Sequence, residues 1–152
     1  MPFPPDDDTV ERFLFCVELA PTDPDTELRI VDESRSGGSH GRLHTPVIDL
    51  EGLRSMRAAA TAVDVPTEVR RFVVDTTAAI RAAENVVIGP STIAALAVVQ
   101  AAAALAAANG RNSASIDDVR SVLIPVLGHR TLLREAVDGS SRDLIERISR
   151  RS

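Results

Sequence analysis

The stretch STIAALAVVQAAAALAAANG, residues 91–110, decides the fold of this chain. It is apolar nearly all round a helix and rich in alanine, which has the highest helix propensity. Ser91 is a helix-capping residue, and Asn109-Gly110 is a typical helix end. We expect a helix to Ala108 at the centre of a bundle. A membrane span is not expected, because the run is mostly alanine and carries Gln100.

Helix signals also precede this stretch. Asp49 can cap a helix from Leu50 to about Thr61, and Pro66 stands at a favoured first helical position. Apolar residues then recur at helical spacing, which predicts an amphipathic helix. They are Val69, Phe72, Val73, Ile80 and Ala83.

Two further helices are expected after residue 110. Residues 115–118 (SIDD) have the form of a capping box and open a helix that Pro125 should interrupt. Residues 140–143 (SSRD) open a last helix. Together these segments predict a helical domain over residues 49–152.

The N-terminal part differs in pattern. Phe13–Leu19 (FLFCVEL) is short, apolar and partly aromatic, which predicts a β-strand. A lone strand needs a sheet, and the rest of the sequence supplies none, so we expect a missing N-terminal unit. A short helix through Glu27–Val31 should follow. We divide the chain into residues 1–33, a Gly/Ser-rich linker at 34–48, and the helical domain.

Composition excludes several functions. The net charge is −5 and the arginines are spread along the chain, which argues against nucleic acid as a partner. A helical DNA-binding domain is therefore the weakest alternative. We expect no metal site, because the three histidines lack ligand spacing, and no membrane association. Without a basic signal region, the cytoplasm is the expected location.

Two smaller features allow a structural interpretation. Cys16 lies in an apolar run, and we interpret it as a small buried hydrophobe. His129, Arg130 and Arg134 form a basic cluster that we interpret as a solvated face, with contact to an ATPase core or a partner as the alternative.

Six segments, in order and spacing, resemble the C-terminal region of MoxR-type AAA+ ATPases, which are related to the magnesium chelatase ATPase subunit. They are residues 9–15 (TVERFLF), 20–24 (APTDP), 65–69 (VPTEV), 88–91 (IGPS), 110–119 (GRNSASIDDV) and 125–130 (PVLGHR). The resemblance implies a mainly α fold: the helical lid bundle, preceded by one leftover strand and a short helix. Residues 1–33 would then be a remnant of the AAA+ core.

The same resemblance implies roles for particular residues. Arg12 matches the arginine-finger position, although Glu11 stands where the family usually has aspartate. An arginine suits that role because its guanidinium stays charged and forks onto phosphate oxygens. Residues 89–91 (Gly89, Pro90 and Ser91) match the lid loop at the nucleotide. Ile93 stands at the sensor-arginine position, cannot pair with phosphate, and is expected to pack in the core.

The phosphate-binding signature G-x-x-x-x-G-K-[ST] is absent. We therefore expect ATP and Mg²⁺ only in a complete ring, and none for this chain alone. The first hypothesis is the C-terminal part of an ATPase that hydrolyses ATP in a ring and remodels an unidentified protein substrate. Its partners would be the AAA+ core or neighbouring subunits. The alternative is a non-catalytic, lid-like interaction module that binds a partner ATPase, with its strand added to the partner's sheet.

Overall fold

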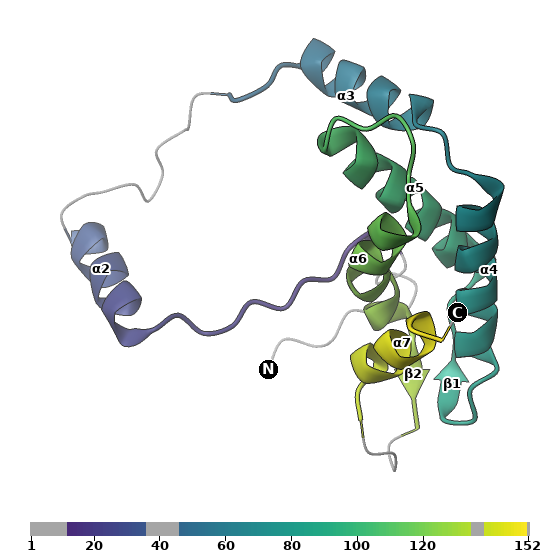
Figure 1. Cartoon of the computed structure of the whole chain (residues 1–152). Helices are drawn as coiled ribbons and strands as arrows, with labels where there is room; N and C mark the ends of the chain where they lie inside the picture. The colour runs from purple at the N-terminus through teal and green to yellow at the C-terminus, as the bar shows by residue number, and fades with distance from the viewer. Residues whose placement is uncertain (1–11, 36–45, 135–138, 152) are drawn as a thin grey trace.

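The computed structural model describes residues 12–35, 46–134 and 139–151. The fold is mainly helical, as expected (Figure 1). The helices, in chain order, are α2 (Pro24–Arg35), α3 (Leu50–Ala62), α4 (Thr67–Arg81), α5 (Thr92–Ala108), α6 (Ile116–Leu127) and α7 (Ser141–Ser149). A 3₁₀ turn, η1 (Gly128–Arg130), follows α6.

Side-chain caps mark the starts of α3, α5, α6 and α7, whereas α4 begins after Pro66 without one. Asp49 accepts a hydrogen bond from the Gly52 amide at 2.7 Å, and Ser91 accepts one from the Ala94 amide at 3.1 Å. Ser115 and Ser140 each form a complete capping box with the aspartate three residues later. These caps satisfy amide groups that a helix start otherwise leaves without partners.

The hydrophobic core surrounds α5. Four of its small residues, Ala94, Ala97, Ala101 and Ala102, lie in one buried cluster with residues from α4, α6 and α7. Alanine side chains let neighbouring helices approach closely, so α5 contacts α3, α4 and α6. The central position predicted for this helix is confirmed.

A two-stranded antiparallel sheet lies at one end of the bundle. It joins β1 (Val86–Ile88) to β2 (Leu132–Leu133), and the Arg134 amide donates to the Asn85 carbonyl at 3.0 Å. The sequence pattern predicted neither strand. The sheet ties the loop before α5 to the segment after η1.

Pro125 does not interrupt α6, contrary to the expectation. The helix continues to Leu127, because the proline lies in its last turn, where the missing N–H removes a single helical bond. Val126 and Leu127 are fully buried, and their packing holds that turn in place.

Phe13–Leu19 is extended but forms no strand, so that part of the expectation is wrong. The physical reason is that no second strand lies beside it among the described residues. Cys16 is exposed and not buried, because the segment has no core around it. The predicted short helix is α2, which lies apart from the bundle in Figure 1.

The proposed division into three parts stays a prediction. Residues 1–11 and 36–45, which include most of the expected linker, lie outside the described residues. Within the described ranges, the helices are all too short or too polar to cross a membrane.

Candidate functional site

The loop at residues 89–91 is tightly packed between β1 and α5. A Cβ on Gly89 would stand 2.7 Å from Cγ of Arg81 and 3.0 Å from its Cα, so only glycine fits without a shift. Arg81 Nη1 donates to the Pro90 carbonyl at 2.9 Å, and Pro90 is buried. Ser91 caps α5. The loop is therefore fixed to the end of α4.

Ile93 lies in the first turn of α5 and is 69% exposed, so its interpretation as a packed core residue is wrong. Leu96, three residues later on the same face, is exposed as well. A helix that is apolar all round does not reveal in sequence which face the bundle covers. The sensor position therefore presents an apolar side chain at the surface.

Arg81 is the functional candidate that the sequence analysis missed. It ends α4, yet its side chain lies against the Gly89-Pro90 backbone. The sequence pattern did not point to it, because the contact joins the end of α4 to the loop before α5. It is the arginine that the structure places at this loop.

Arg12 precedes a segment whose backbone contacts η1 and the C-terminal end of α6. It is exposed, and it directly precedes Phe13. The Phe13 carbonyl accepts from Arg130 Nη2 at 2.8 Å, and His129 Nε2 lies 3.2 Å from the same oxygen. The Cys16 amide donates to the Pro125 carbonyl at 2.8 Å. These contacts do not involve the 89–91 loop, which packs against the end of α4.

The basic cluster is not simply a solvated face. Arg130 is only 8% exposed and also donates from Nη1 to the Val126 carbonyl at 3.3 Å, whereas Arg134 is exposed. Burial lowers the pKa of His129, although its contact with the Phe13 carbonyl opposes that shift. A neutral imidazole with its proton on Nε2 can donate to that carbonyl.

Arg111 and Asp118 carry a structural role. Two bonds of 2.6 Å and 2.5 Å join the guanidinium to the carboxylate, which is the N3 residue of the α6 capping box. The hydrogen bonds from Arg111 hold the pKa of Asp118 well below its usual range. The pair ties the turn before α6 to the helix start.

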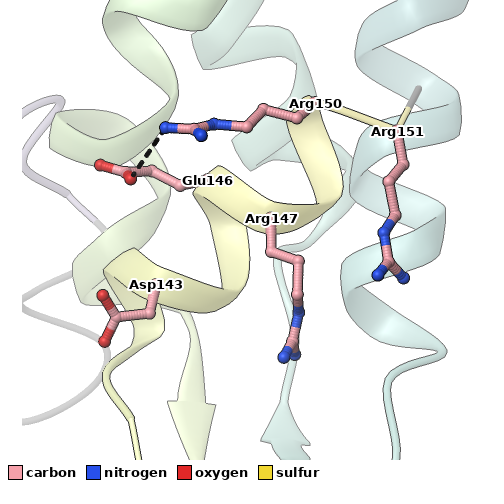
Figure 2. A pocket seen from close by; sticks show the side chains of 5 residues that line it. All are labelled: Asp143, Glu146, Arg147, Arg150 and Arg151. Atoms are coloured by element: carbon pink, nitrogen blue, oxygen red, sulfur yellow. Dashed lines mark ion pairs between the residues drawn. The ribbon is translucent and has the colours of Figure 1, made fainter.

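A surface hollow on α7 is lined by charged residues only (Figure 2). They are Asp143, Glu146, Arg147, Arg150 and Arg151. Arg150 and Glu146 form an ion pair of 3.8 Å between exposed side chains, and Asp143 accepts hydrogen bonds within the Ser140 cap. Such solvated ion pairs contribute little to stability. None of the residues that line the hollow is buried. Across residues 12–35, 46–134 and 139–151, no metal-ligand cluster occurs.

Comparison with known proteins adds two findings. Residues 78–148 match the AAA lid domain family. The solved structure of a "putative ATPase" from Cytophaga hutchinsonii shares the fold, with a TM-score of 0.84 and 23% sequence identity. The alignment covers 99% of this chain and 49% of that one, so this chain spans about half the length of that protein. Nothing among the curated proteins matches.

The match to the AAA lid domain family runs from the last turn of α4 into α7, within the fold shared with the Cytophaga structure. At 23% identity the structural likeness establishes the fold alone. It does not establish the activity of a complete ATPase for this chain.

Proposed function

We propose that this chain is the lid part of a MoxR-type AAA+ ATPase that hydrolyses ATP in a ring and remodels partner proteins. The order of the six resembling segments supports the MoxR type. The AAA lid match over residues 78–148 supports the lid role. The ring activity would need a P-loop core in addition to this chain.

The observation that carries the proposal is the exposed apolar surface of the segment N-terminal to the helical bundle. Phe13, Val17 and Leu19 are 64%, 70% and 90% exposed, and α2 buries no residue against the described part of the chain. An apolar surface of this kind usually marks an interaction site.

The occupant that fits this surface is the AAA+ core. The fold shared with the Cytophaga protein covers nearly all of this chain but half of that protein. The other half of such an ATPase is therefore the candidate to cover α2 and the extended segment. In this arrangement, Phe13–Leu19 would add to a core sheet, where backbone groups other than the Phe13 carbonyl and the Cys16 amide would gain partners.

The residues of this chain do not fit Mg-ATP by themselves. The sequence contains no lysine, so it cannot supply the P-loop lysine that contacts the β- and γ-phosphates. What the chain can offer is the exposed Arg12, whose guanidinium would stabilise negative charge at a neighbouring subunit's site. Ile93 would add only an apolar contact beside the nucleotide.

The test is Arg12→Ala in the ring assembled with its P-loop core, supplied on the same or a separate polypeptide. Arginine fingers contribute about 10³–10⁵ to kcat, so we expect a loss of at least about a thousandfold. Arg134→Ala, which removes another exposed arginine, is the matched control and should leave the rate unchanged. Hydrolysis that persists in Arg12→Ala would refute the finger role.

The interaction module remains the second candidate, and the surface-exposed Ile93 favours it. In that case the chain would bind the core, but neither Arg12→Ala nor removal of the chain would change the core's hydrolysis rate. Binding by titration and hydrolysis measured on the same samples separate the two candidates.

A further inference from the structure

We propose that Arg130 and His129 form a clamp that positions Arg12 relative to the lid. The clamp is defined here as these two side chains and the Phe13 carbonyl they contact. Its positioning role rests on the proposed function of Arg12, whereas its geometry stands independently. Arg130 would be a positioning residue, because it contacts the backbone next to Arg12 and not the nucleotide.

Both side chains of the clamp contact the same atom. Arg130 Nη2 and His129 Nε2 lie 2.8 Å and 3.2 Å from the Phe13 carbonyl oxygen. A charged donor makes the stronger of such contacts. Because Phe13 directly follows Arg12, fixing this carbonyl restricts where the Arg12 backbone can lie.

Side-chain packing covers this segment only in part. Phe13, Val17 and Leu19 are largely exposed, whereas Leu14 and Phe15 are 39% and 47% exposed. Among the described residues, a second backbone contact to the bundle is the bond of 2.8 Å from the Cys16 amide to the Pro125 carbonyl. Hydrogen bonds to backbone groups therefore help to fix the position of residues 13–16.

Hydrogen bonds hold the lid side of the clamp to its neighbouring helices. Arg130 is buried and also donates to the Val126 carbonyl of α6. Thr131 Oγ1 donates to the Leu127 carbonyl at 2.9 Å, and Ser141 Oγ donates to the Gly128 carbonyl at 3.0 Å. These bonds join η1 to α6 and α7. A displacement of the lid would therefore move Phe13, and Arg12 with it.

Cys16 is the only cysteine in the chain and is exposed, so it offers a natural site for a nitroxide label. The measurement is the mobility of that label by electron paramagnetic resonance in the full chain. We compare the wild type with Arg130→Gln, which removes the charge and the forked donors. Arg130→Lys keeps the positive charge and a hydrogen-bond donor but not the forked guanidinium. Arg134→Gln is the control, because it alters an exposed arginine four residues later.

We expect the label to move several-fold faster in Arg130→Gln than in the wild type. Arg130→Lys should restore part of the restriction, and Arg134→Gln should change nothing. In the ring assembled with its core, Arg130→Gln should lower kcat by up to about 100-fold, the scale of a displacement of about 1 Å, with KM unchanged. A merely structural role would lower thermal stability without this split between kcat and KM.

Three results would overturn the inference or separate it from the proposed function. Unchanged label mobility in folded Arg130→Gln would refute the clamp. A mobile label with normal kcat, while Arg12→Ala still abolishes hydrolysis, would refute its positioning role. If Arg12→Ala has no effect, the proposed function fails and label mobility alone decides on the clamp. Should Arg130→Gln not fold, His129→Ala removes the second donor and should loosen the label to a smaller degree.

Discussion

Replacing Gly89 by alanine tests the packing of the loop before α5. An ideal Cβ at this position would stand 2.7 Å from Arg81 Cγ, 3.0 Å from Arg81 Cα and 3.3 Å from Arg81 Cβ. Favourable carbon–carbon contacts lie at about 3.5–4.0 Å, so all three are too close. The side-chain atom can move, but the Cα belongs to α4 and moves only with the helix.

Two opposing effects determine the magnitude. Overpacking of this kind costs about 1–3 kcal/mol. A glycine-to-alanine change also stabilises by about 0.4–1 kcal/mol, because it reduces the conformational entropy of the unfolded chain. The net prediction for Gly89→Ala is a loss of roughly 1–2 kcal/mol in the free energy of unfolding.

Gly128→Ala provides the matched control. A Cβ at Gly128 meets nothing within 4 Å, and the backbone there is ordinary right-handed helix, with φ −56° and ψ −46°. We expect this variant to gain about 0.4–1 kcal/mol. Urea unfolding of both variants, followed by circular dichroism at 222 nm, measures the difference. The packing argument fails if Gly89→Ala is as stable as Gly128→Ala.

Three further predictions concern the bundle. Leu127→Ala, at a fully buried site, should cost about 2–5 kcal/mol, while Leu96→Ala at the surface should cost far less; thermal unfolding of both compares them. Ser91→Ala should cost about 1 kcal/mol, because Ala94 loses its cap, and amide exchange at that residue should accelerate. Asp118→Asn should destabilise most above about pH 5, because the lowered pKa of Asp118 makes its contribution present above the unfolded value of about 3.9 and lost as pH falls through the folded value. A destabilisation independent of pH, in urea unfolding from pH 7 to pH 3, would contradict that assignment.

The helix starts could be predicted from the sequence because capping is local. Asp49, Ser91, Ser115 and Ser140 each bond to an amide three residues later, so the pattern alone carries the information. The central position of α5 also followed from its composition. These features need no knowledge of distant parts of the chain.

Features that depend on tertiary contacts could not be predicted in this way. Arg130 donates to the carbonyl of Phe13, which lies 117 residues earlier. The continuation of α6 past Pro125 depends on the packing of Leu127. The exposure of Ile93 depends on which face of α5 its neighbours cover. Of the candidate site residues, Ser91 has the predicted cap, while the roles of Arg12 and the loop remain predictions.

The contacts that hold residues 13–16 to the bundle are made to a carbonyl and an amide of the main chain, and every amino acid except proline has both. These two bonds therefore do not depend on which side chains stand at positions 13 and 16. Both side chains can change to suit another sheet without removing the bonds. A designer could transplant the bundle onto a different strand by keeping α6 and η1 and excluding proline at position 16.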